Sequence, residues 1–334
     1  SILGSEAIYN FLRNSIKKKF YFLNNLDIHK ILNLKKKISS KDTLFIVISK
    51  SGNTIETLSN FFYLDILKKN SKNIIIISEK KNSLLFSLSK RLNLFYIEHK
   101  DYIGGRYSVL SEVGMVPAHL MGLNLSKFRS QITDFFKSNN KTFLKNSSIK
   151  LASLMLKKTN ILIFLNYSPK IEKFLFWSQQ LIAESLGKKN KGFLPVISNV
   201  PKDHHSLMQL YLDGPKDKLY NIFSVEEKSN EKINVKKNIG IDSFLNKKKL
   251  SEVKNAQKRA LIKSLIKNNI SFREFIIKKT NEEVLGKLFS YFIIETIVIA
   301  KLLNINPFNQ PAVEKVKILT KGFLKSNKFT KKNF

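Results

Sequence analysis

A run of apolar residues that ends abruptly in a short polar turn constrains the fold of this chain more than any other stretch. Residues 44–48 read LFIVI without polar alternation, which favours a strand covered on both faces, as in a parallel sheet. The turn at residues 49–54 combines three hydroxyl side chains with a lysine and Gly52. Apolar residues then recur at helical spacing from Ile55. The sequence therefore predicts a loop between a strand and a helix N-terminus, where a phosphate group is well stabilised.

This turn alone is equally compatible with a serine-rich helix cap that binds no ligand. The rest of the chain, however, repeats the alternation of apolar strands with helices that is typical of doubly wound α/β proteins. The predicted strands lie at residues 21–23, 44–48, 74–77, 94–97, 161–165, 192–198 and 219–225. The predicted helices lie near the N-terminus and at residues 55–66, 83–91, 126–157, 171–186, 251–267 and 282–303, with a last helix from about residue 312 and a frayed tail beyond residue 325.

Charge and cysteine content narrow the class of protein. The formal net charge is +34, but only six of the 59 basic residues are arginine, and no nucleic-acid-binding motif is visible. Specific nucleic-acid binding is therefore not expected. The apolar run at residues 288–303 is too short to span a bilayer, and cysteine is absent, which fits a cytoplasmic protein. The lysine-rich stretch at residues 226–249 is predicted to be a surface insertion.

Three further stretches carry candidate functional residues. Arg106 follows two glycines, so it is either a buried structural arginine or a partner for an anion. Glu184 lies near the end of a predicted helix, where a solvated carboxylate is the simpler interpretation. His204 and His205 open another predicted helix, a position that suits acid–base chemistry but also a structural histidine. No third metal ligand lies at a suitable spacing, so we expect no metal site.

Taken together, five stretches resemble the phosphoglucose isomerase family, in the family's order and over nearly the whole chain. They are SKSGNTIET at residues 49–57, GGRYSVLSEVG at 104–114, QLIAESLGKKNKG at 180–192, HHSLMQLYLDGPKDK at 204–218 and INPFNQPAVEKVK at 305–317. Residues 1–8 resemble the continuation of a glycine-glycine-serine turn, so the first strand and both glycines are expected upstream. Val316 departs from the family pattern, which usually has glycine before the active lysine.

The resemblance implies an α/β fold with two flavodoxin-like sugar-isomerase (SIS) domains, each a three-layer sandwich with a parallel sheet, plus C-terminal helices. The expected first domain covers residues 1–125 and lacks its first strand. The expected second domain covers residues 126–304. Residues 305–334 would form a helical segment that completes the active site.

The resemblance also implies the interconversion of glucose 6-phosphate and fructose 6-phosphate by ring opening and proton transfer through a cis-enediolate. Glu184 would move the carbon-bound proton, Arg106 would stabilise the enediolate, and His205 would open the ring with help from Lys317. The implied phosphate contacts are Ser49, Lys50, Ser51 and Thr54, and the implied further substrate contacts are Ser1 and Gln310. No metal or other cofactor is implied. The resemblance does imply a homodimer, because the family's histidine reaches the site from the neighbouring subunit.

Two alternatives remain open from the sequence. A non-catalytic sugar-phosphate-binding regulator could keep residues 49–54, although it has no need of Glu184, His205 and Lys317 together. An isomerase acting on another hexose phosphate could share all of these residues, because a phosphate-binding loop does not distinguish one sugar from another.

Overall fold

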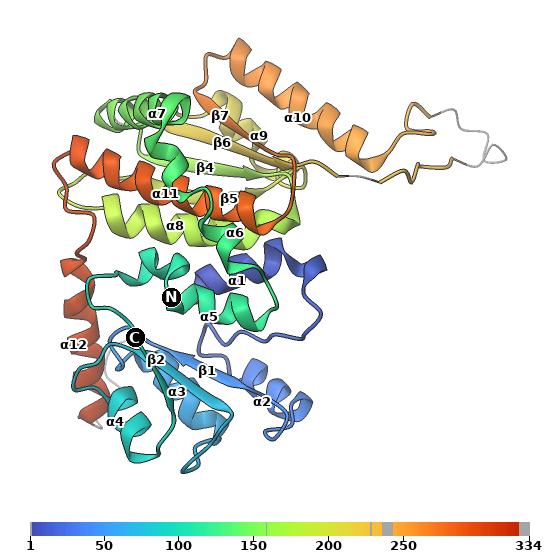
Figure 1. Ribbon diagram of the computed structural model, residues 1–334. Helices are drawn as coiled ribbons and strands as arrows, with labels where there is room; N and C mark the ends of the chain where they lie inside the picture. Colours follow the sequence, from blue (N-terminus) through green and yellow to red (C-terminus); the bar gives the residue numbers. More distant parts are fainter. Residues whose placement is uncertain (1, 158, 228, 236–242, 327–334) are drawn as a thin grey trace.

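The structure, a computed structural model, contains two separate parallel β-sheets surrounded by helices (Figure 1). It describes residues 2–157, 159–227, 229–235 and 243–326. The first sheet has the order β1-β2-β3 and consists of β1 (Phe45–Ile48), β2 (Ile74–Ser78) and β3 (Phe95–Glu98). The second has the order β5-β4-β6-β7 and consists of β4 (Ile161–Asn166), β5 (Leu194–Asn199), β6 (Lys218–Val225) and β7 (Phe272–Ile277). The predicted α/β class with parallel sheets is confirmed.

Three helices accompany the first sheet, namely α2 (Ile28–Lys37), α3 (Ile55–Leu64) and α4 (Leu84–Arg91). Two of them follow residues whose side chains accept a backbone N–H: Asp27 caps α2 and Ser83 caps α4. The apolar run at residues 44–48 becomes β1, and Phe45 and Val47 pack with Ile74 and Ile76 of β2. The strand, the polar turn and the helix therefore occur where the sequence places them.

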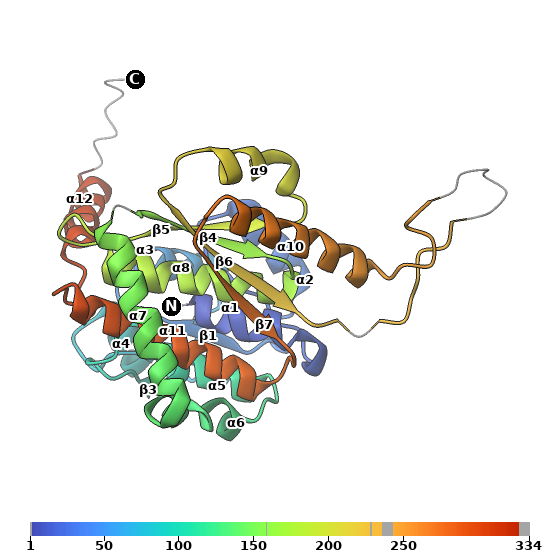
Figure 2. The same ribbon diagram turned by 90° about the horizontal axis from the view of Figure 1, so that it is seen from above.

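Helices cover both faces of the second sheet (Figure 2). Side chains of β4 alternate between the two faces, with Leu162 and Phe164 on one side and Ile163 and Leu165 on the other. The first face meets α7 (Ser138–Leu156), α8 (Glu172–Leu186) and α11 (Glu282–Leu302). The second face meets α9 (His204–Asp213) and α10 (Leu250–Lys267). This gives the predicted three layers around the second sheet.

A helix from the N-terminal part of the chain packs on α8, which covers the second sheet. The helix α1 (Ile2–Phe11) packs against both α8 and α5 (Glu112–Leu120). Ala7, Ile8 and Ala118 are buried in the same core cluster as Leu181 of α8. The short elements between α5 and β4 are α6 (Leu125–Arg129) and a 3-10 helix, η3 (Ile132–Phe136), so the single helix predicted at residues 126–157 is divided. The remaining 3-10 helices are η1 (Arg13–Ser15), η2 (Gly105–Leu110) and η4 (Pro169–Ile171).

Three strand predictions need correction. Residues 21–23 form no strand, because neighbouring Phe20 and Phe22 pack their rings on Tyr9 instead of joining a sheet. The apolar sequence at residues 94–97 suggests a buried strand, but β3 lies at the edge of its sheet, and Phe95 is 61% exposed. The strand β7 was not predicted, because its sequence interrupts apolar residues with Arg273 and Glu274.

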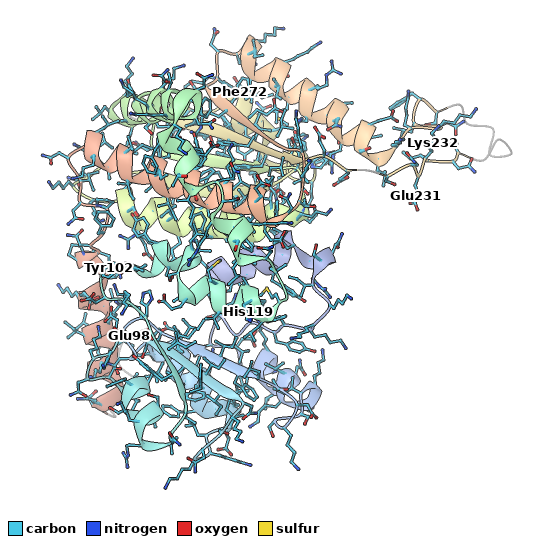
Figure 3. All side chains as sticks on the ribbon, viewed as in Figure 1. Glu98, Tyr102, His119, Glu231, Lys232 and Phe272 are labelled. Carbon is cyan, nitrogen blue, oxygen red and sulfur yellow. The ribbon has the colours of Figure 1, made fainter. Side chains whose placement is uncertain are left out.

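The last helix and one loop stand apart from the two sheets. The helix α12 (Pro311–Lys325) runs beside the first sheet, and no residue in it is buried (Figure 1). The described part of residues 226–249 extends away from the body, with Glu231 and Lys232 far out on it (Figure 3), as a surface insertion predicts. Among the helices described, none has the length and apolar character needed to cross a membrane. The predicted frayed tail lies almost wholly at residues 327–334, outside the described residues.

Candidate active site

The side chain of Arg106 is the centre of the site. Arg106 is the second residue of η2, which begins at Gly105, and it is only 3% exposed. Its Nε donates to Ser185 Oγ at 2.8 Å, and its Nη1 donates to Glu184 Oε2 at 3.2 Å and to Gln310 Oε1 at 3.0 Å. Three residues that the sequence singles out separately, Arg106, Glu184 and Gln310, are therefore in direct contact.

The second terminal nitrogen of Arg106 fixes the loop between α11 and α12. Nη2 donates to the carbonyl oxygens of Pro307 and Asn309, the latter at 3.2 Å. Every nitrogen of the guanidinium thus has an acceptor, which a buried cation requires. Arg106 is both a buried structural arginine and a charge placed beside a carboxylate, so the two interpretations that the sequence left open are not exclusive.

Glu184 is held at both oxygens yet remains accessible. Besides the contact to Arg106, its Oε1 accepts a hydrogen bond from Gln180 Nε2 at 2.9 Å, one turn earlier on α8. The Glu184 side chain is 34% exposed, whereas its partner Arg106 is almost fully buried. A fixed, partly accessible carboxylate next to a fixed cation can remove a proton from carbon and leave the resulting negative charge next to that cation.

Two residues that were not predicted from the sequence, Ser185 and Tyr107, support Arg106. The Tyr107 hydroxyl lies 2.7 Å from Ser185 Oγ and donates to the Pro307 carbonyl at 3.1 Å. Burial raises the pKa of Tyr107, an effect that the contact with Ser185 and the charge of Arg106 oppose. Its ring also lies 5.6 Å from that of Phe308. Only its position directly after Arg106 could have pointed to Tyr107.

The loop that carries Arg106 is also anchored at its start. His99 is buried, and its Nε2 lies 3.0 Å from the Ile103 carbonyl while its Nδ1 contacts the Glu112 carboxylate. Between them, Tyr102 points outward and is 79% exposed, at the level between the two sheets (Figure 3). These two contacts of His99 tie the start of the loop to α5.

The polar turn at residues 49–54 has the form of an anion-binding loop. Ser49 Oγ lies 2.7 Å from Thr54 Oγ1, and Ser51 Oγ lies 3.4 Å from the same atom, so the three hydroxyls gather at the start of α3. The ammonium of Lys50 instead donates to the Asp101 carbonyl at 2.8 Å and pairs with Glu79 at 3.3 Å. Lys50 therefore links this loop to the one that leads to Arg106, and its ammonium is occupied by these two acceptors.

Gly52 gives this loop its shape, and we expect Gly52→Ala to damage it. The φ angle of Gly52 is +66°, and an added Cβ would lie 2.2 Å from Ser83 Oγ. A residue other than glycine in this region costs about 1–3 kcal/mol, and the contact with Ser83 adds to that cost. Calorimetric titration with inorganic phosphate should show weaker binding, and thermal unfolding should show a lower Tm. Gly322→Ala on α12, where nothing lies within 4 Å of the new Cβ, is the matched control, and equal behaviour of the two variants would contradict the expectation.

Two predicted site residues do not join this cluster within a single chain. His205 is exposed at the start of α9, which packs on the opposite face of the second sheet from α8. Its neighbour His204 instead lies 3.0 Å from the Tyr167 hydroxyl. Burial lowers the pKa of His204, and the nearby charge of His205 lowers it further, whereas Asp203 raises it. The exposed side chain of His205 is therefore accessible to a second molecule.

Lys317 is the other predicted residue outside the cluster. It is exposed on α12, and its ammonium forms an ion pair with Glu314 at 2.7 Å, one helical turn earlier. Val316, where the family usually has glycine, is 64% exposed and so crowds nothing in this chain. Ser1, the remaining predicted contact, lies outside the described residues. Within the described ranges, no group of three or more His, Asp or Glu side chains is arranged to hold a metal ion.

Known proteins resemble this chain over most of its length. The family model described as phosphoglucose isomerase matches residues 1–333. A protein of Methanococcus maripaludis named probable glucose-6-phosphate isomerase is 33% identical, over 100% of this chain and 78% of its own length. A protein of Campylobacter jejuni named glucose-6-phosphate isomerase is 32% identical, over 98% of this chain and 83% of its own length.

Solved structures agree with the fold. The crystal structure of a hypothetical protein from Thermus thermophilus superposes with a TM-score of 0.86 at 25% identity, covering 96% of this chain and 81% of that one. A glucose-6-phosphate isomerase from Chlamydia trachomatis superposes with a TM-score of 0.79 at 19% identity, covering 98% of this chain and 68% of that one. At 19% identity, the second match supports the fold alone.

Proposed function

Because this chain belongs to the phosphoglucose isomerase family, we propose that the contact between Arg106, Glu184 and Gln310 is the active site of a glucose-6-phosphate isomerase. The enzyme interconverts glucose 6-phosphate and fructose 6-phosphate, a step of glycolysis and gluconeogenesis. The observation that carries the assignment of the site is the buried guanidinium of Arg106 against the accessible carboxylate of Glu184. The non-catalytic regulator is not favoured, since such a protein needs no base beside its anion site.

Glu184 and Arg106 divide the isomerisation between them. The carboxylate of Glu184 removes the proton from carbon 2 of the open-chain aldose and returns it to carbon 1. The same steps in reverse order convert the ketose into the aldose. Between the two transfers the sugar is an enediolate, whose negative charge the guanidinium of Arg106 stabilises. The contact at 3.2 Å puts the two groups side by side before the substrate arrives, so little reorganisation is needed.

The other end of the substrate binds to the turn at residues 49–54. We assign the phosphate to Ser49, Ser51 and Thr54 and to the backbone of Lys50, supported by the gathered hydroxyls and the start of α3. Binding energy from the phosphate then orients the carbons that react. Gln310 and Ser1 are the further proposed substrate contacts, and only Gln310 lies in the described part, against Arg106. Only protons move in this scheme, so no residue has to hold a metal or another cofactor.

Ring opening needs an acid and a base at the sugar oxygens, and we assign these roles to His205 with assistance from Lys317. Within one chain, His205 lies on another face of the second sheet from Glu184, which supports delivery from a neighbouring subunit. A homodimer is therefore part of the proposal. An exposed position near a helix N-terminus leaves the imidazole of His205 accessible to a second molecule.

Mixed dimers test whether His205 acts across subunits. Glu184→Gln and His205→Asn are each expected to be nearly inactive alone. In a mixed dimer, one of the two sites receives Glu184 from one chain and His205 from the other, so co-expression at equal levels should restore about a quarter of the wild-type activity. If both residues act within one chain, every site lacks one of them and no activity returns. Mixing the two purified variants without exchange of subunits is the control.

The substrate is tested by a coupled assay that offers fructose 6-phosphate, mannose 6-phosphate and glucosamine 6-phosphate in parallel. Preferred turnover of fructose 6-phosphate is the expected result. Turnover of only another hexose phosphate, or binding without turnover, would contradict the assignment.

We propose domain boundaries near residues 125 and 304, although the core cluster that joins α1, α5 and α8 contains residues from both sides of the first boundary. We assign the enzyme to the cytoplasm, which the absence of cysteine supports. The excess of lysine over arginine supports the view that the large positive charge serves no specific nucleic-acid binding.

A further inference from the structure

The turn that follows the Glu184 helix holds the chain beyond α11 by its lysines. Three ammonium groups donate to backbone carbonyls there: Lys188 to Asn306 at 2.7 Å, Lys189 to Asn304 at 3.2 Å and Lys191 to Leu303 at 3.1 Å. These carbonyls belong to the C-terminal end of α11 and to the loop that follows it. We call this arrangement of residues 188, 189 and 191 on residues 303–306 the lysine clamp.

The clamped segment is the one that holds Arg106. It continues directly into Pro307 and Asn309, whose carbonyls accept from Arg106, and into Gln310, whose side chain does the same. The loop is thus fixed from both sides, by the lysine clamp at its start and by the guanidinium at its end. A shift at its start would move the acceptors that hold Arg106 beside Glu184.

Lys188 is the member of the clamp closest to the chemistry. Unlike Lys189 and Lys191 it is half-buried, and it also donates to the Ser185 carbonyl at 3.1 Å, directly after Glu184. Burial lowers the pKa of Lys188, the charge of Arg106 lowers it further, and Glu184 opposes both effects. Lys188 therefore connects the end of α8, next to the proposed base, with the loop that holds the proposed cation.

We propose that Lys188 is a positioning residue for the isomerisation. By bridging the Ser185 and Asn306 carbonyls, it keeps the loop at residues 304–310 in the register that holds Arg106 against Glu184. This proposal rests on the proposed function. The simpler explanation is that Lys188 only stabilises the C-terminus of α8, as cations at helix ends commonly do, and the two explanations predict different kinetics.

The test compares Lys188→Met with Lys216→Met, a matched control. Lys216 is exposed and donates to the Leu212 carbonyl near the end of α9, also at 2.7 Å, but far along the chain from Arg106. For Lys188→Met we expect kcat to fall by about tenfold or more, the size of effect that a small misplacement of reacting groups produces, while KM changes little because the phosphate loop is untouched. Lys216→Met should keep the wild-type kcat.

Amide hydrogen exchange supplies a readout that does not depend on turnover. Lys188→Met should speed exchange in a peptide covering residues 304–310 and leave a peptide covering residues 49–58 unchanged. Equal kcat in the two variants, or a loss of kcat without faster exchange in residues 304–310, would overturn the proposal. A wild-type enzyme without turnover would instead refute the proposed function, while the exchange result would still show whether Lys188 holds the loop.

Discussion

Replacing Glu184 with glutamine is expected to lower kcat for fructose 6-phosphate by about 10²–10⁴-fold, the usual contribution of a positioned general base. Glutamine has nearly the same shape, and its side-chain oxygen can still accept a hydrogen bond from Arg106. Its amide nitrogen can donate to the side-chain oxygen of Gln180 once the Gln180 amide has rotated. What the variant lacks is a group that can take the carbon-bound proton. Binding of the sugar phosphate should survive, because the phosphate loop follows β1 and does not include Glu184.

Two measurements separate this result from a folding defect. Titration of the variant with fructose 6-phosphate should give a Kd close to that of the wild type, and transfer of deuterium from solvent into the sugar should disappear together with turnover. Glu172→Gln is the matched control, since Glu172 lies in the first turn of the same helix and accepts from Asn199 at 2.9 Å. Wild-type turnover by Glu184→Gln would remove Glu184 from the role of base.

The local structure of the phosphate loop was predictable because its signals are local. An unbroken apolar run, a glycine in the turn and an apolar face at helical spacing fix β1, the loop and α3 without reference to the rest of the chain. The wrong strand at residues 21–23 and the missed strand β7 have the opposite origin. The ring of Phe22 packs on that of Tyr9, and Arg273 in β7 forms an ion pair with Glu295 at 2.6 Å. Neither partner is a neighbour in sequence, so local patterns do not show these contacts.

The candidate site was predictable residue by residue but not as an arrangement. Arg106, Glu184 and Gln310 could be named from the stretches that carry them, whereas their contacts depend on how η2, α8 and the loop after α11 pack together. Tyr107 and Lys188 gave no such signal, because their role is to hold other groups and not to meet the substrate. His205 could be named too, yet its proposed partners belong to another subunit, which a single sequence does not describe.

Arg106→Lys is expected to lower kcat/KM by about 10²–10³-fold, the usual loss when a donor to a developing negative charge is removed. The guanidinium donates in three directions at once, to Ser185 Oγ, to the carbonyls of the loop at residues 307–309 and to the carboxylate of Glu184. An ammonium offers its donors from a single nitrogen and cannot match this fork. Buried acceptors would be left without a partner, each costing about 1–3 kcal/mol, so the free energy of unfolding should fall as well.

The loss of activity has to be distinguished from that loss of stability. Kinetics should therefore be measured well below the Tm of Arg106→Lys, with circular dichroism showing that the variant is folded. Arg129→Lys is the control, because Arg129 also donates to a backbone carbonyl, that of Leu110 at 3.2 Å, but in an exposed position away from Glu184. A folded Arg106→Lys enzyme with the wild-type kcat/KM would show that Arg106 only supports the loop, and the enediolate would then need another cation.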